Sequence, residues 1–297
     1  MRGKLQMPAK DPQKLAAALR ANLVKRKQQA KARKLAQRAK CNQGAKCNQG
    51  AKCNQVKSDS ARPAPTMLVE KLDEAGLGKA GLQILAQMPA AGMVPKSMLG
   101  QSQNRVLLLI GSVGGAYWPA FARWLDRSHP VLDPLNCWSR TIATTLAGSA
   151  CVDEIQVLFP FEGPPYWPFQ SWALSSGLFH QTPIGVLIHR VWGSWFTFHF
   201  ALVMDGVVDL PAEEKGGSPC LDCVEKPCLH HCPVGAMTES GGLAVEPCKA
   251  HLHSGMGDEC FTHACLARWA CPVGINWRYS RQVARFHMNA YAGSSHG

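Results

Sequence analysis

The chain has 297 residues and a formal net charge of +12, and one segment carries all of that excess. Residues 1–60 contain 16 Lys and Arg against two acidic residues. Subtracting these from the chain totals of 32 and 20 leaves 16 basic and 18 acidic residues in 61–297. No apolar run reaches the roughly 18 residues of a membrane-spanning helix, which excludes a membrane span. No signal peptide is recognised at the start, so a cytoplasmic location is expected.

The basic tail, residues 1–65, begins with a segment of helical character. Asp11 can cap a helix that starts at Pro12, and Leu15, Leu19 and Leu23 recur at four-residue spacing, which predicts a helix over about 12–38. The stripe fades after Val24, so the tail is expected to be disordered or helical and mainly solvated. Binding of nucleic acid or of an anionic membrane surface through its positive charge is the alternative.

A tandem repeat follows this segment and precedes a linker at 58–65. The unit Ala39-Lys40-Cys41-Asn42-Gln43 recurs at 45–49 and at 51–55. A six-residue step puts successive cysteines on different faces of a helix. We therefore interpret Cys41, Cys47 and Cys53 as products of sequence expansion and not as metal ligands.

The body alternates apolar segments of helical and of strand character. Helices are predicted at Met67–Ala75, 138–147 and 170–178. Strands are predicted at Val106–Gly111, Ile155–Phe161, Ile184–Ile188 and Trp195–Met204. This order predicts an α+β (or α/β) fold, with an upstream domain at 66–211 and a small cysteine-rich domain at 212–297.

Eight cysteines in this last domain form the most specific pattern of the chain. Each of two groups of four ends in the tetrapeptide Cys-Pro-Val-Gly, at Cys232 and at Cys271. Four thiolates hold one [4Fe–4S] cluster, and the runs of bacterial two-cluster ferredoxins also close with Cys-Pro. Two [4Fe–4S] clusters are therefore expected. Structural zinc and disulfides are the alternatives, and His230, His231 and His263 are read as surface or second-shell residues.

Resemblance to known proteins extends this interpretation. The segment Ser218–Gly274 resembles the dicluster domain of epoxyqueuosine reductases, the cobalamin-dependent enzymes of queuosine tRNA modification. Gly193-Ser194-Trp195-Phe196 and Val208-Asp209-Leu210-Pro211 are similar to the segment that leads those enzymes into their first cysteine. Residues 66–290 more closely resemble uncharacterised bacterial 4Fe-4S ferredoxin-like proteins, including Pro183-Ile184-Gly185.

The resemblance implies how the ligands are divided. It assigns one cluster to Cys220, Cys223, Cys228 and Cys271, and the other to Cys232, Cys248, Cys260 and Cys265. The ferredoxin rule, in which the Cys-Pro cysteine of each run crosses to the other cluster, gives the same partition.

The catalytic part of those reductases is not found. Where they carry an acidic proton donor, this chain has Gly163-Pro164-Pro165-Tyr166. Epoxyqueuosine reduction is therefore not expected, the catalytic residues are unknown, and no residue supports the cobalamin that the resemblance allows. The nearby Glu162 and Asp153 are read as surface carboxylates.

These observations predict an iron–sulfur redox protein that is oxidoreductase-like if it is an enzyme. It would bind two [4Fe–4S] clusters and transfer single electrons to a redox partner protein or to a substrate. Two alternatives remain open. One is a reductase with a bound organic cofactor, and the other is a nucleic-acid-binding protein whose clusters are structural.

Overall fold

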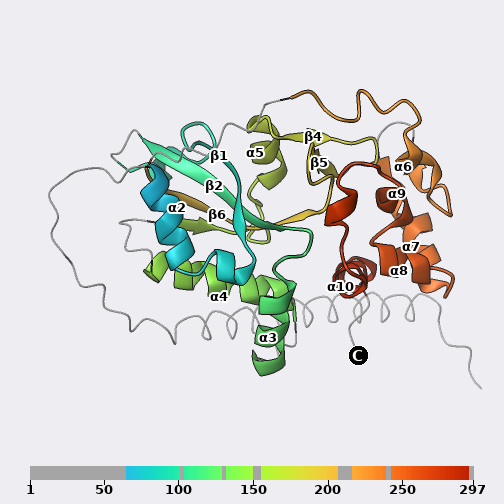
Figure 1. Ribbon diagram of the computed structural model, residues 1–297, viewed down its shortest axis with the longest axis horizontal. Coiled ribbons are helices and arrows are strands. Elements are labelled where there is room, and N and C mark those ends of the chain that lie inside the picture. The colour runs from blue at the N-terminus through green and yellow to red at the C-terminus, as the bar shows by residue number, and fades with distance from the viewer. Residues whose placement is uncertain are drawn as a thin grey trace, which may run out of the picture.

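The computed structural model describes residues 65–100, 104–128, 132–149, 155–206, 216–238 and 242–293. The fold is α+β, as the sequence predicts (Figure 1). The predicted helix at 12–38 and the repeat with Cys41, Cys47 and Cys53 lie outside the described residues.

An antiparallel sheet is the centre of the upstream part. Its strand order is β1-β2-β6-β3, with β1 at Gln83–Pro89, β2 at Arg105–Val113, β6 at Phe196–Asp205 and β3 at Gln156–Leu158. All three pairings are antiparallel. The long central strands β2 and β6 pair from Arg105 opposite Asp205 to Val113 opposite Phe196, with one register shift after Ile110.

Both faces of this sheet are buried, which explains why its central strands are continuous apolar runs. Along β2, Leu108 and Ile110 belong to one core cluster, whereas Leu107 and Leu109 belong to the other. The first cluster includes residues of α2 (Pro65–Glu74), α3 (Trp118–Ser128) and α4 (Pro134–Ser149). The second includes residues of α5 (Phe169–Ser175). The sheet thus carries helices on both sides (Figure 1).

A hairpin connects α5 to the last strand of the sheet. Its strands are β4 (Phe179–Gln181) and β5 (Leu187–His189), which pair with His180 opposite Ile188. The chain then makes a tight turn from His189 to Gly193, in which each of these two residues donates its N–H to the other's carbonyl, at 2.8 and 3.0 Å. This turn leads directly into β6 and lies against the C-terminal part, next to Val273 and Gly274.

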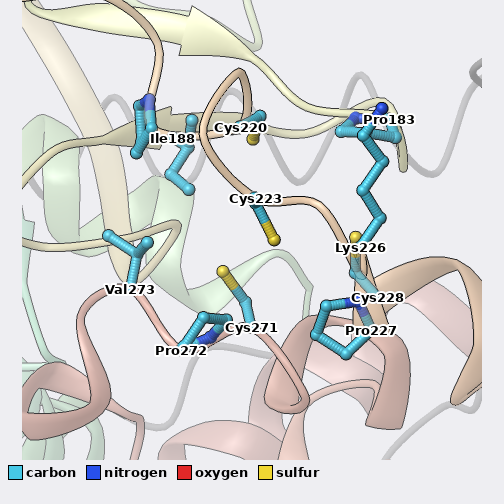
Figure 2. Close-up of a pocket in the computed structure, with 11 residues that line it drawn as sticks. Pro183, Ile188, Cys220, Cys223, Lys226, Pro227, Cys228, Cys271, Pro272 and Val273 are labelled. Atoms are coloured by element: carbon cyan, nitrogen blue, oxygen red, sulfur yellow. The ribbon is translucent and has the colours of Figure 1, made fainter.

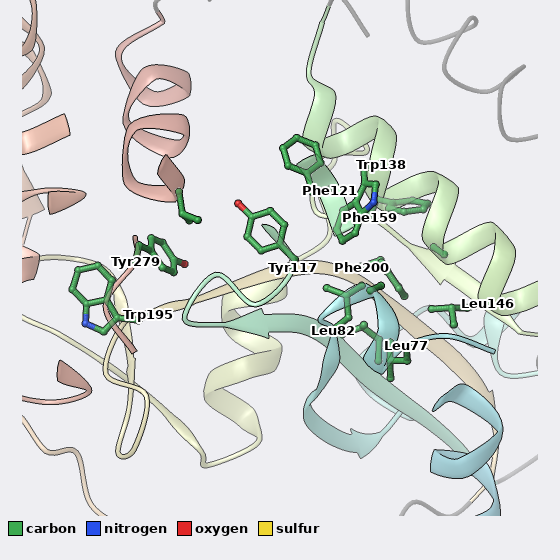
Figure 3. Packing of buried hydrophobic residues seen from close by; sticks show 14 of the residues in the cluster. Leu77, Leu82, Tyr117, Phe121, Trp138, Leu146, Phe159, Trp195, Phe200 and Tyr279 are labelled. Atoms are coloured by element: carbon green, nitrogen blue, oxygen red, sulfur yellow. The ribbon is translucent and has the colours of Figure 1, made fainter. Parts of the chain in front are cut away.

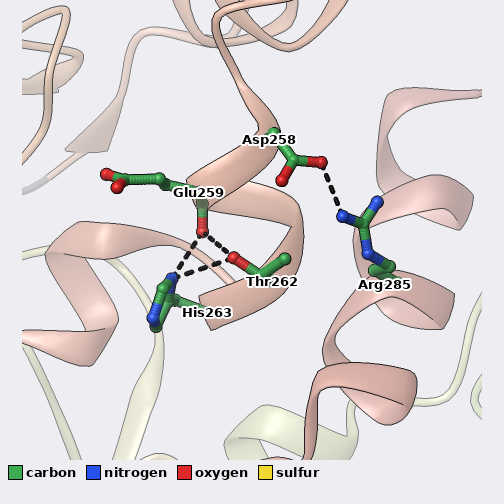
Figure 4. A network of polar contacts seen from close by, with 5 residues as sticks. All are labelled: Asp258, Glu259, Thr262, His263 and Arg285. Carbon is green, nitrogen blue, oxygen red and sulfur yellow. Dashed lines mark hydrogen bonds and ion pairs between the residues drawn. The ribbon is translucent and has the colours of Figure 1, made fainter.

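The C-terminal part consists of short helices and loops beside the sheet (Figure 1). Its helices are α6 (Pro227–His230), α7 (Val245–His253), α8 (Asp258–His263), α9 (Leu266–Trp269) and α10 (Arg281–Ala292), with a small hairpin of β7 (Met237–Thr238) and β8 (Gly242–Leu243). An ion pair of 2.6 Å between Asp258 and Arg285 links α8 to α10 (Figure 4). Ser280 accepts a hydrogen bond from the Val283 N–H and caps α10.

The two parts share the larger core cluster. Leu252, Cys260, Val283 and Met288 of the C-terminal part belong to the same buried cluster as the sheet residues Leu108 and Phe200. Figure 3 shows Tyr279 and Trp195 at one end of this cluster and Leu77 and Leu146 at the other. Polar contacts cross the same border, because Tyr117 and His287 are hydrogen-bonded at 3.0 Å and Thr197 and Tyr279 at 2.9 Å.

Most of the predicted elements are present, with adjusted ends. The helix predicted at 138–147 is α4, and the strand predicted at Trp195–Met204 is β6. The strand predicted at Ile155–Phe161 shrinks to Gln156–Leu158, and β1, α3 and α10 were not predicted. Among the described residues, no helix has the length and apolar character needed to cross a membrane.

Candidate thiol site

Four of the predicted site cysteines line one pocket. Cys220, Cys223 and Cys228 come from a single loop and helix start, and Cys271 joins them from 43 positions further along the chain. Figure 2 shows these four residues around a common space. The remaining lining residues are mostly apolar: Pro183, Ile188, Pro219, Lys226, Pro227, Pro272 and Val273. This set is the group of four that the sequence assigns together, and we call it the first thiol pocket.

Local backbone geometry places the three cysteines of the loop. Ser218 begins a turn, accepting hydrogen bonds from the N–H groups of Leu221 and Cys220. Lys226 then adopts a left-handed conformation with φ of 40°, and Pro227 starts α6 at its first position, where a missing N–H costs nothing. Cys228 is consequently buried at the start of a four-residue helix.

The two Cys-Pro-Val-Gly segments form similar turns. Their glycines, Gly235 and Gly274, both have positive φ, at 57° and 76°. In the first turn the Gly235 N–H bonds to the Cys232 carbonyl at 3.1 Å, and the Ala236 N–H donates to the Cys232 sulfur at 3.2 Å. The surroundings differ, however. A Cβ on Gly235 would meet nothing within 4 Å, whereas one on Gly274 would overlap the backbone of Trp192.

The remaining four cysteines influence one another electrostatically. Burial raises the pKa of the Cys260 thiol, and the neighbouring Cys265, Cys232 and Cys248 raise it further. Burial likewise raises the pKa of Cys265, with Cys232 and Cys248 adding to the effect. These residues come from α7, α8 and the turns at Cys232 and Cys265, and we call them the second thiol group.

Ionisation of the first pocket follows the same rule. Burial raises the pKa of Cys228, and the neighbouring Cys271, Cys220 and Cys223 raise it further. Burial also raises the pKa of Cys271, although the nearby Arg278 acts in the opposite direction. At neutral pH the Cys228 and Cys271 side chains are therefore neutral thiols, which are weaker nucleophiles than thiolates.

The expected iron–sulfur clusters are not supported by this geometry. Among the residues that the structure describes, no three or more His, Cys, Asp or Glu side chains form a group that could hold a metal ion. The four cysteines line a shared pocket, but they do not form a coordination site. This finding contradicts the prediction of two [4Fe–4S] clusters and, with it, the prediction of a ferredoxin-like iron–sulfur electron carrier.

The other polar residues considered from the sequence are not among those that line the first thiol pocket. His230 and His231 are exposed. The His263 ring is bound within its own helix, 2.9 Å from the Glu259 carbonyl and 3.0 Å from the Thr262 hydroxyl (Figure 4). Glu162 pairs with Arg140 at 2.6 Å, and Asp153 lies outside the described residues.

Sequence reasoning missed the wall of the pocket that comes from the upstream part. Pro183 and Ile188 belong to the β4–β5 hairpin, some 30 residues or more before the first pocket cysteine. Their apolar character predicts burial, but no spacing rule links them to a cysteine pattern so far along the chain. Only the tertiary contact reveals their position.

Comparisons with known proteins were made with this geometry in hand. No family model matches the chain, and no curated protein matches it. Among solved structures, one similar chain is a C. elegans B12-trafficking protein, CblC, described as a homologue of human MMACHC. The identity is 13%, the TM-score is 0.48, and the match covers 77% of this chain and 93% of that chain. Similarity at this level carries no functional argument.

The resemblance to epoxyqueuosine reductases and to 4Fe-4S ferredoxin-like proteins is therefore corrected. No family model and no curated protein matches the chain, and the described residues contain no metal-binding group of the kind that those families need. The cysteine pattern that suggested the resemblance does bring four residues to one pocket. That convergence is the observation from which a function has to be argued.

Proposed function

We propose that this protein binds a small thiophilic ligand, one with a soft, electron-pair-accepting centre that bonds to cysteine sulfur. The observation that carries the proposal is the convergence of Cys220, Cys223 and Cys228 with the distant Cys271 on one pocket. Thiols are the only hydrogen-bonding or nucleophilic side chains in the lining apart from Lys226. Soft electron-pair acceptors are the class that prefers sulfur donors. The second thiol group is proposed as a further binding site of the same chemical class.

Binding at the first thiol pocket is expected to release protons. Burial holds the pKa of Cys220, Cys228 and Cys271 above the ordinary value, so these residues begin as S–H groups. When a sulfur lone pair forms the bond to the soft centre, the S–H bond breaks and its proton passes to solvent. Bonding through one or two of the four sulfurs suffices, so no cage of three or more ligands is needed.

The test uses the full chain, isolated anaerobically and without chelators. Its bound elements and small molecules are measured, and its cysteines are then alkylated with iodoacetamide and located by mass spectrometry. We expect a bound species and joint protection of Cys220, Cys223, Cys228 and Cys271. The double variant Cys223→Ser/Cys271→Ser should lose that species. The matched control, serine at Cys41, Cys47 and Cys53 of the tail, should keep it.

The proposal fails if the isolated chain carries no bound species and its eight C-terminal cysteines react at unrelated rates. It also fails if the tail control loses as much of the bound species as the pocket variant does. In the second case, the repeat at Cys41 would supply the binding thiols.

We further propose a partner for the basic tail. The 16 basic residues of 1–60 suit a polyanion such as RNA. Binding to RNA that weakens steeply with salt and disappears on deletion of 1–60 supports this partner, whereas salt-independent binding contradicts it.

A further inference from the structure

The first thiol pocket is built from two parts of the chain that are far apart in sequence. Its cysteines belong to the C-terminal part, but Ile188 lies on β5 of the upstream hairpin. In Figure 2, Ile188 points from its strand towards the cysteines. Val273 lies on the same side of the pocket as Ile188. Ile188 is 1% exposed, so its side chain is enclosed between the hairpin and the pocket.

A rigid turn holds this wall in place. After β5, the His189–Gly193 turn is closed by its two backbone hydrogen bonds. The His189 side chain reinforces it, because Nδ1 accepts from the Val191 and Trp192 N–H groups at 3.2 and 3.4 Å. The imidazole also stacks on the Trp192 ring, with a centroid distance of 3.8 Å. These contacts of His189 fix the backbone next to Ile188 and so the orientation of the Ile188 side chain.

The same turn packs directly on the loop that carries Cys271. A Cβ on Gly193 would overlap the Val273 carbonyl oxygen, and one on Gly274 would overlap the Trp192 backbone. Because both residues are glycine, the two backbones approach within a distance that no side chain allows. Ile188 and Cys271 are therefore held at a fixed separation by main chain.

The second Cys-Pro-Val-Gly turn has this support and the first does not. Around Gly235, which has a similar φ, a Cβ would meet nothing within 4 Å. Gly235 therefore lacks the contact that Gly274 makes with the His189–Gly193 turn. An apolar wall excludes water and polar groups from a ligand at the sulfur, because burying an unpaired polar group is unfavourable.

We propose that Ile188 is the specificity-determining residue of the first thiol pocket, because it forms an inner wall that limits the size of the group that can lie against the sulfurs. This inference rests on the proposed function for the identity of the site, but its physical content is selection by size inside the pocket. Ile188 is buried, whereas Cys220, Cys223 and Cys271 are partly exposed, so Ile188 restricts the space beside the sulfurs and not the entry from solvent. In the native chain a compact thiol reagent should fit against the pocket sulfurs, and a somewhat larger one should fit poorly.

The test compares iodoacetamide with the larger N-ethylmaleimide on the full chain, after removal of any bound species, with each cysteine followed by mass spectrometry. Ile188→Ala removes crowding beside the sulfurs, so it should speed N-ethylmaleimide labelling of Cys220, Cys223, Cys228 and Cys271 about tenfold and leave iodoacetamide rates nearly unchanged. The matched control is Val186→Ala, because Val186 lies on the same hairpin and is exposed. Labelling of Cys232, Cys248, Cys260 and Cys265 serves as an internal reference.

Two results overturn the inference. Unchanged N-ethylmaleimide labelling in Ile188→Ala means that another residue limits the space beside the sulfurs. Equal acceleration at both thiol groups, or by both reagents, means that the substitution loosens the fold and not the pocket. Neither result depends on whether the isolated protein carries a bound species, so the inference and the proposed function can fail separately.

Discussion

At the scale of single residues, the buried His199 and the partly buried His287 make the stability of the fold depend on pH. His199 lies between two serines, with Nε2 3.3 Å from the Ser112 hydroxyl and Nδ1 3.0 Å from the Ser139 hydroxyl. Ser139 already donates to the Leu135 carbonyl at 2.8 Å, so it accepts from Nδ1–H, and the Ser112 hydroxyl donates to Nε2. Neutral imidazole satisfies this arrangement, and a second ring proton would require the Ser112 hydroxyl to rotate and accept instead of donating.

Acid should therefore destabilise the protein well above the ordinary range of carboxylate titration. Burial and then His287 lower the pKa of His199 from 6.5 to about 3, and burial and then Arg268 lower that of His287 to about 4. The unfolded chain takes up both protons first. The free energy of unfolding should thus fall as pH drops below 6.5, by up to about 1.4 kcal/mol per pH unit for each histidine.

Urea unfolding at pH 7, 6 and 5 measures this slope. His287→Gln should unfold with a shallower dependence on pH, because one of the two titrating rings is gone. His253→Asn is the control, since His253 is exposed at the end of α7 and should leave the slope unchanged. Equal slopes in the native chain and in His287→Gln would show that other groups govern the acid response.

At the scale of elements, the paired Cys-Pro-Val-Gly turns allow a direct measurement of how the thiol pocket is held. Alanine at either Gly235 or Gly274 imposes a similar strain from positive φ, about 1–2 kcal/mol. Only alanine at Gly274 also collides with the Trp192 backbone. Gly274→Ala should therefore lower the free energy of unfolding by about 1–3 kcal/mol more than Gly235→Ala does.

Denaturant unfolding of the two variants provides the comparison, with Cys271 labelling as a local readout. Faster labelling of Cys271 is expected in Gly274→Ala alone. Matching losses of stability in both variants would show that the contact with Trp192 contributes little beyond the backbone strain.

These elements also show how much of the structure can be predicted from the sequence. The apolar runs at Val106–Gly111 and Trp195–Met204 predict the two central strands, because a strand buried on both faces needs no alternation. The cysteine pattern predicts which four residues share the first pocket. It fails on what they bind, since spacing restricts the chain path but leaves the positions of the sulfur atoms open. The β5 wall is absent from any local pattern because it depends on a contact between distant segments.

At the scale of the whole molecule, the upstream and C-terminal parts share one core. Phe121 of α3 is fully buried and packs on Trp138 of α4 at 5.8 Å and on Phe286 of α10 at 5.2 Å between ring centroids. Arg268 spans the same border, donating to Ser194 while its guanidinium lies 4.3 Å from the Trp195 ring and 4.8 Å from that of Tyr279. The division into domains at 66–211 and 212–297 stays a prediction from sequence, and this packing argues that the two segments fold together.

The last prediction follows from that shared core. If the two parts form one cooperative unit, the amides of β2 and β6 and those of α8 and α10 should exchange with solvent through the same global opening. Phe121→Ala removes a ring that touches both parts and should lower the free energy of opening by about 3–5 kcal/mol in all four elements. Phe169→Ala is the matched control, because Phe169 packs in the other core cluster, on the far face of the sheet. It should act through global stability alone, without weakening the border locally.

Native-state hydrogen exchange followed by mass spectrometry measures all four elements at once. Lower protection of α8 and α10 than of the sheet in the native chain, with no response there to Phe121→Ala, would mean that the C-terminal part opens on its own.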